Sequence, residues 1–371
     1  MGIHREWRAG SRLLIGALAL AALACTGGDT TATTDATMDA PSDATVDAAD
    51  PTPDNPTDVS PVDAPVLPDV PAPAVTLENY PRVDGSTSNI PLARVIACEL
   101  LGVPWQWEYQ PMTPDSTYPE KTVVPAPTTP AQETLAAGIL ERTVHTKTHQ
   151  SYLNLIDGTR DLILVASAPS DDERAYATTK GVTIEWKAVA LDALVFLVNQ
   201  ENPVVGLTTE QIRRTYMAQV ANWTELGGPD RPVHPYARPV NSGSQQLMQE
   251  LVMKELVMPV WPDDMMISGM GGLVDKIKED PDSLGYSVYY YVTFQYSIGG
   301  MRLLAVDGVA PSAATLADRS YPHVAPVWVV TRTDLGPATL AAQMRDWLLA
   351  AGGQAVVAKS GYVPVMPLPA K

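Results

Sequence analysis

Apolar residues follow two different spacings between residues 80 and 371. Continuous apolar runs at 161–165 and 189–198 predict strands that are covered on both faces of a sheet. Apolar residues three and four positions apart between Pro91 and Leu101 predict a helix, and Thr208 with Gln211 forms a capping-box pattern that starts another. Further strands are expected at 233–238, 284–288 and 327–331, and further helices at 135–142, 242–255, 272–279 and 338–350. Repeated strand–turn–helix units predict an α/β fold.

The first 25 residues have the pattern of an export signal. Three arginines within residues 5–12 precede an apolar stretch at 13–24, which is too short to span a membrane and is typical of a signal peptide. The stretch ends in Ala22-Leu23-Ala24-Cys25, which resembles a bacterial lipobox with Ala22 in place of the usual leucine. The pattern therefore predicts lipidation of Cys25 and a lipoprotein that faces the periplasm or the cell exterior. An ordinary secretory signal with an incidental cysteine is the alternative.

Residues 25–79 differ in composition from the rest of the chain. They are rich in Thr, Ala, Asp and Pro, contain no Lys or Arg, and lack the aromatic residues and periodicity needed to bury a core. This composition predicts a disordered tether. The stretch also carries most of the excess negative charge of the chain, whose formal net charge is −17 over 371 residues. An acidic protein of this kind is not expected to bind nucleic acid, and two cysteines are too few for a disulfide scaffold or a Cys-based zinc site.

Candidate chemistry gathers where predicted strands turn into predicted helices. Small hydroxyl residues occupy two such turns, at 85–89 (GSTSN) and 241–244 (NSGS), and a third candidate, 146–148 (TKT), precedes a helix. Arg238 lies four residues before Ser242. Unpaired N–H groups at a helix start, together with hydroxyl donors and an arginine, suit an oxyanion. Each hydroxyl taken alone is more simply explained as an N-cap.

The sequence gives weaker support for a catalytic or metal-binding site than for an oxyanion site. The sequence has no G-x-S-x-G elbow, no H-E-x-x-H and no P-loop. His145 and His149 have helical spacing but no evident carboxylate partner, so we interpret them as a solvated pair rather than metal ligands. No cofactor is predicted, and a hydrolase that uses Ser242 is a minor alternative.

Several stretches together resemble the phosphate-binding receptors of ABC transporters. They are 82–92 (RVDGSTSNIPL), 190–199, 207–212 (LTTEQI), 222–223 before 227–228, 238–245 (RPVNSGSQ), 285–290 (GYSVYY) and 361–364 (GYVP). The resemblance implies a two-lobed periplasmic binding protein of type II with two hinge crossings, with lobe 1 at about 80–188 and 300–371 and lobe 2 at about 189–299. It also implies a monomeric binding protein, not an enzyme, that passes phosphate to ABC permease subunits.

The resemblance implies a set of ligand-binding residues. They would be Ser86, Thr87, Asn89, Ile90 (through its backbone N–H) and Thr148 from lobe 1, and Arg238, Ser242, Gly243 and Ser244 from lobe 2.

Three positions depart from the family pattern. Asn89 replaces a threonine, Val240 replaces an acidic residue that usually pairs with the arginine, and Ser167 or Ala168 stands where a carboxylate is expected, unless Asp171 moves in. A carboxylate accepts the proton of hydrogen phosphate and repels sulfate, which has no proton to donate. We therefore expect a tetrahedral oxyanion to bind with weak discrimination between phosphate and sulfate. The long acidic tether favours one alternative function, a surface-tethered sensor or interaction lipoprotein with altered or lost ligand specificity.

Overall fold

The computed structural model describes residues 69–110, 117–296 and 299–366. All of these described residues belong to one compact unit. The predicted signal peptide, Cys25 and the tether as far as residue 68 lie outside the described residues. Within the described ranges, no helix combines the length and apolar character needed to cross a membrane.

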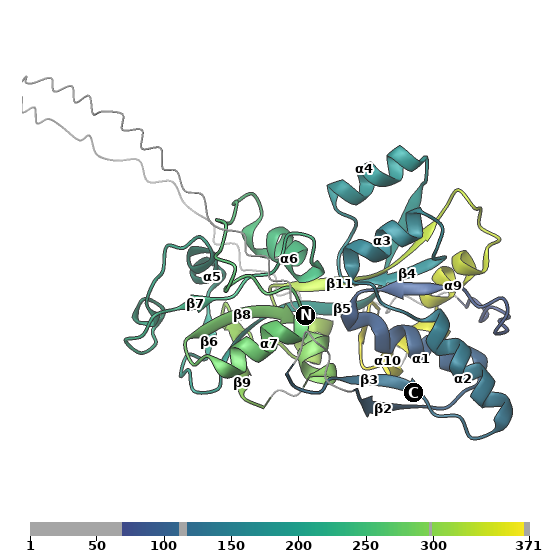
Figure 1. Ribbon diagram of the computed structural model, residues 1–371, viewed down its shortest axis with the longest axis horizontal. Helices are drawn as coiled ribbons and strands as arrows, with labels where there is room; N and C mark the ends of the chain where they lie inside the picture. The colour runs from purple at the N-terminus through teal and green to yellow at the C-terminus, as the bar shows by residue number, and fades with distance from the viewer. Residues whose placement is uncertain (1–68, 111–116, 297–298, 367–371) are drawn as a thin grey trace, which may run out of the picture. The chain divides into compact units, whose positions relative to one another are not determined.

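Strands and helices alternate along the unit (Figure 1). The strands are β1 (Val83–Gly85), β2 (Trp105–Tyr109), β3 (Lys121–Pro125), β4 (Leu162–Val165), β5 (Ile184–Asn199), β6 (Gly206–Leu207), β7 (His234–Pro235), β8 (Ser283–Val288), β9 (Met301–Leu303), β10 (Ala305–Val306), β11 (Val324–Arg332) and β12 (Val363–Pro364). The α-helices are α1 (Ile90–Leu101), α2 (Pro130–Arg142), α3 (Thr148–Ile156), α4 (Asp171–Lys180), α5 (Thr209–Tyr216), α6 (Gly243–Leu247), α7 (Met270–Glu279), α8 (Ala313–Ala317), α9 (Leu340–Leu348) and α10 (Ala351–Lys359). Two 3₁₀ turns, η1 (Thr87–Asn89) and η2 (Trp223–Leu226), and two π-helices, η3 (Met248–Met253) and η4 (Tyr291–Gln295), complete the helical segments of the described residues.

One sheet carries the site, in the order β1-β4-β11-β5-β8-β7. β1 pairs with β4 in parallel at one end, and β7 pairs with β8 in parallel at the other. The long strands β5 and β11 run antiparallel between these two pairs, and Figure 1 shows them joining two groups of helices. The carboxyl ends of each parallel pair are the usual position for a ligand in such a sheet.

The hydrophobic side chains form separate cores at the two ends of the sheet. Along β5, Val189 and Ala190 belong to one core and Ala193 to Val198 belong to the other. Along β11, Ala325 and Val327 are divided in the same way. The chain therefore crosses between two lobes twice, near Leu191–Asp192 and near Pro326, and these positions pair directly.

We define lobe 1 as the described residues of 69–191 and 326–366, and lobe 2 as those of 192–325, from which Tyr290 reaches into the lobe 1 core. This corrects the predicted return of the chain to lobe 1 at residue 300. Met301, Leu304, Leu316 and Tyr321 belong to the lobe 2 core, because β9 pairs with the lobe 2 half of β5. The two-lobed α/β architecture with two crossings is as predicted.

The folded part begins before residue 80, where we predicted the tether to end. Val70 and Val75 pack against the lobe 1 core, and Tyr80 is buried. Leu77 occupies the space in front of Gly138, where an added Cβ would lie 2.3 Å from the leucine side chain. Residues 69–79 therefore belong to the fold, because scattered apolar side chains in a proline-rich segment find a groove to fill.

Candidate anion-binding site

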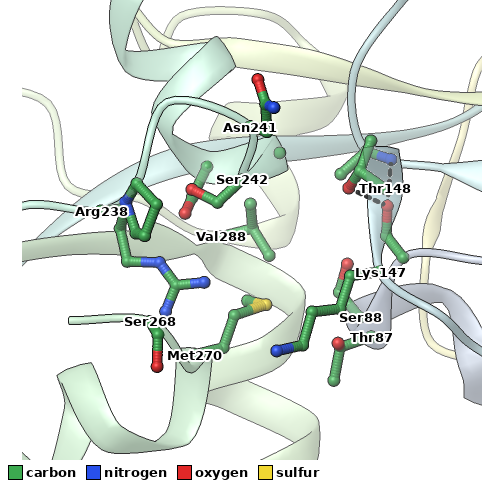
Figure 2. A pocket seen from close by; sticks show the side chains of 15 residues that line it. Thr87, Ser88, Lys147, Thr148, Arg238, Asn241, Ser242, Ser268, Met270 and Val288 are labelled. Atoms are coloured by element: carbon green, nitrogen blue, oxygen red, sulfur yellow. Dashed lines mark hydrogen bonds between the residues drawn. The ribbon is translucent and has the colours of Figure 1, made fainter. Parts of the chain in front are cut away.

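A cavity of about 270 Å³ lies between the lobes, at the carboxyl ends of both parallel strand pairs. Its lining is rich in hydroxyl groups and includes two cations that Figure 2 shows directed into the cavity from opposite sides, Lys147 and Arg238. The lobe 1 residues are Ser86, Thr87, Ser88, Lys147, Thr148 and Ala166. The lobe 2 residues are Arg238, Pro239, Asn241, Ser242, Gly243, Ser244, Ser268, Met270 and Val288.

The lobe 1 hydroxyls are held by long-range hydrogen bonds. Ser86 follows β1, and its Oγ accepts the Ala166 N–H at 3.0 Å from the end of β4. The same oxygen lies 2.7 Å from Thr148 Oγ1 at the start of α3. Because one hydroxyl proton joins these two oxygens, the other proton of the pair remains available to an anion. Gly85 is required beside them, since a Cβ there would lie 1.9 Å from the Leu164 carbonyl oxygen.

The buried carboxylate of Asp84 fixes the turn that carries Lys147. Asp84 accepts the Thr146 N–H and hydroxyl at 2.8 Å each, and also the Asn154 side-chain amide at 2.8 Å. The next residue, Lys147, has φ +73°, a left-handed backbone that is uncommon for a residue with a side chain. This turn directs the lysine side chain toward the cavity (Figure 2).

In lobe 2, hydrogen bonds of Tyr286 hold the segments that carry the cavity-lining residues Arg238 and Ser242. Arg238 follows β7 and is 5% exposed, and its backbone N–H donates to Tyr286 Oη at 2.9 Å. Tyr286 in turn donates to the Gln245 side chain in α6, and burial raises the pKa of Tyr286 above its usual value, so its hydroxyl stays protonated as a donor. Ser242 Oγ accepts the Gln245 N–H at 3.3 Å as the N-cap of α6, which leaves its hydroxyl proton for the cavity.

The two lobes touch beside the cavity. A Cβ built on Gly243 would lie 2.5 Å from Thr148 Oγ1, so only glycine allows this approach. Nearby, Ser167 of lobe 1 hydrogen-bonds Gln246 of lobe 2.

Seven of the nine predicted ligand residues line the cavity, and Asn89 and Ile90 do not. Residues 87–89 form a 3₁₀ turn, so the Ile90 N–H donates to the Thr87 carbonyl and the Asn89 N–H to that of Ser86. The Asn89 side chain is buried and donates to Tyr362 Oη at 2.8 Å. We therefore remove Asn89 and Ile90 from the candidate set, because neither residue lines the cavity and their backbone N–H groups donate within lobe 1.

The departures from the family pattern leave no carboxylate among the described residues that line the cavity. Asp171 begins α4 with its side chain 97% exposed and paired with Arg174, so it does not take the acceptor position. Val240 is 80% exposed.

The predicted ligand set omitted eight residues that line the cavity: Ser88, Lys147, Ala166, Pro239, Asn241, Ser268, Met270 and Val288. Three of them, Ser88, Lys147 and Asn241, lie inside the candidate stretches 85–89, 146–148 and 241–244. Ser268-Gly269 before α7 repeats the small-residue pattern of the other helix starts.

Comparisons with known proteins bear on the family and the fold of the chain. The family model of a PBP superfamily domain matches residues 114–351. The phosphate-binding protein PstS of Borreliella burgdorferi is 23% identical over 181 residues, which cover 47% of this chain and 64% of that protein. PstS of Bacillus subtilis is 28% identical over 181 residues, covering 48% of this chain and 56% of the relative. The chain thus spans less than two thirds of the length of these two relatives.

Among solved structures, a Clostridium perfringens substrate-binding protein with bound phosphate is similar with a TM-score of 0.54 and 18% identity. The likeness covers 76% of this chain and 98% of that protein. At this identity it shows the shared two-lobed fold.

Proposed function

The chain belongs to the PBP superfamily, and on that basis we propose that it captures phosphate or a related tetrahedral oxyanion between its lobes. One observation carries the proposal: two cations from different lobes, Lys147 and Arg238, line the same hydroxyl-rich cavity. The PstS relatives from Borreliella burgdorferi and Bacillus subtilis are phosphate-binding proteins, which adds support from outside the chain.

Each lobe would supply some of the hydrogen-bond donors that surround the anion. Arg238 offers a forked pair of N–H donors, which suits two oxygens of one anion. The Ser86–Thr148 pair and Ser242 each offer a hydroxyl proton from opposite sides. Because the donors come from both lobes, the anion would stabilise the state in which the lobes touch.

The proposed function is binding rather than catalysis. Ser242 acts as a helix N-cap, and no imidazole or carboxylate lines the described part of the cavity to serve as its base. A hydrolase that uses Ser242 as nucleophile is thus not supported by the arrangement around it.

Delivery and location are part of the same proposal. We propose that the chain is exported, is held to a membrane by a lipid on Cys25, acts as a monomer and hands its ligand to ABC permease subunits. Mass spectrometry of the mature protein should find the lipid on Cys25 and should find none after Cys25→Ser. An unmodified mature N-terminus elsewhere would contradict the anchor without affecting the binding proposal.

Calorimetric titration of the ligand-free chain with phosphate and then sulfate tests the binding. We expect saturable binding of both anions with dissociation constants within about tenfold of each other, because the described lining offers no carboxylate to reject sulfate. Strict selectivity for phosphate would contradict the weak discrimination. Absence of binding by either anion would contradict the function itself.

A further inference from the structure

The cavity keeps its volume although the lobes already touch. Beside it, Thr148 lies against Gly243 and Ser167 hydrogen-bonds Gln246. A second set of contacts joins lobe 1 to α7, where Lys278 lies 4.7 Å from the ring centroid of Tyr118 and the Thr117 N–H donates to Asp275. Further approach of the lobes is therefore limited by atoms that are already in contact.

The remaining space exceeds what a bare oxyanion needs. The cavity of about 270 Å³ is roughly nine times the ~30 Å³ that one water occupies in the liquid. An ion of five heavy atoms replaces only a few waters. The volume instead approaches the lower end of the ~300–1,000 Å³ range of pockets for organic ligands.

Part of the cavity wall is apolar and cannot hydrogen-bond an ion. Met270 packs on the lobe 2 core, and Val288 at the end of β8 is 1% exposed; both side chains line the cavity together with Pro239. Figure 2 shows Met270 and Val288 between Arg238 on one side and Lys147 on the other. These groups offer an anion no hydrogen bond, and polar oxygens placed against them would lose their hydration without replacement.

We propose that the site takes a monosubstituted tetrahedral dianion, R–PO₃²⁻, in which R is a small aliphatic group that lies against Met270 and Val288. The three oxygens face Lys147, Arg238 and the hydroxyl donors that line the same cavity. The substituent fills the space beside the apolar wall. This inference rests on the proposed oxyanion binding and names the class of ligand for that site.

Calorimetric titration of the ligand-free chain with inorganic phosphate, methylphosphonate, ethylphosphonate and propylphosphonate tests the proposal. We expect the affinity to rise along the phosphonate series by about fourfold for each methylene that is buried, until the cavity is full. Propylphosphonate should bind at least tenfold more tightly than phosphate.

A substitution in the apolar part of the cavity wall should change the ratio of phosphonate to phosphate affinity, and not merely lower both affinities. Met270→Gln keeps the length of the side chain but makes the wall polar, so the ratio of propylphosphonate to phosphate affinity should fall at least fivefold. Val288→Thr should move the ratio in the same direction, and a thermal melt of each variant shows whether it folds. Met265→Gln, which lies outside the cavity lining, is the matched control and should leave the ratio unchanged.

The outcomes separate the two levels of the proposal. Tight phosphate binding with weaker binding of every phosphonate would overturn the substituted ligand and leave the oxyanion site intact. Binding of none of the four anions would overturn both. An unaltered ratio in folded Met270→Gln and Val288→Thr would also overturn the placement of the substituent.

Discussion

Each lobe holds a serine hydroxyl at the cavity, but the two lobes position it in different ways. In each lobe a serine hydroxyl accepts a backbone N–H and keeps its own proton or that of a neighbour for the cavity. Ser242 of lobe 2 accepts from Gln245, three residues along the chain. Ser86 of lobe 1 accepts from Ala166, 80 residues away, and also contacts Thr148. The lobe 2 hydroxyl is therefore placed by a local helix cap, and the lobe 1 hydroxyl is placed by the sheet.

This difference explains what the sequence could predict. The turn and helix after Ser242 followed from a local pattern of small residues before an apolar run, and the capping box at Thr208 was confirmed in the same way. The position of Lys147 depends on the bonds of Asp84 to Thr146 and Asn154, which no local pattern contains.

Two other elements differ from the prediction, one for a non-local and one for a local reason. Residues 301–325 join the lobe 2 core through the pairing of β9 with β5, which is invisible in their own sequence. The hairpin of β2 and β3 lies in a segment rich in Pro and Thr for which no strand was predicted, although Trp105, Trp107 and Tyr109 alternate with polar residues as strand residues do.

The largest loss of phosphate affinity is expected when the positive charge of lobe 2 is removed. Arg238→Ala should weaken phosphate binding by at least about 100-fold, because a buried cation that donates to the anion is lost. Titration calorimetry measures the change. Arg214→Ala in the same lobe, with a side chain 43% exposed, is the matched control and should bind normally. Equal affinities of Arg238→Ala and the native chain would show that lobe 2 does not hold the anion through this residue.

The contact between the lobes should be the next most sensitive feature. Gly243→Ala places a methyl carbon 2.5 Å from Thr148 Oγ1, so the lobes must separate and phosphate affinity should fall about 10- to 100-fold. In a Thr148→Ala background the same substitution should cost much less, since the clashing oxygen is gone. Additive effects in this double-mutant cycle would contradict the contact.

The two serine placements predict different stability losses. Ser86→Ala leaves the buried Ala166 N–H without its acceptor and should lower the free energy of unfolding by about 2 kcal/mol. Ser242→Ala removes an N-cap and should cost about 1 kcal/mol. Urea denaturation of the ligand-free variants compares them. A larger loss for Ser242→Ala would reverse our account of how the hydroxyls are held.

The smallest expected effect concerns the crossing between the lobes. Asp192 on β5 is buried, accepts the Tyr290 N–H at 2.9 Å, and has its pKa raised by that burial to about 7. A pKa above that of the unfolded chain means that the folded protein holds the extra proton, so this stabilisation is present at low pH and is lost as the pH rises through 7. Between pH 6 and pH 8 the native chain should lose about 1 kcal/mol of stability relative to Asp192→Asn. A difference between the two proteins that does not change with pH would show that Asp192 does not titrate in this range.

The central claim is that one anion is held by both lobes at once. A crystal structure of the chain with arsenate, located by the anomalous scattering of arsenic, tests it most directly. We predict a single anion within hydrogen-bonding distance of the Arg238 guanidinium and of the Ser86–Thr148 hydroxyl pair. An anion bound to one lobe alone, or located outside this cavity, would contradict the account.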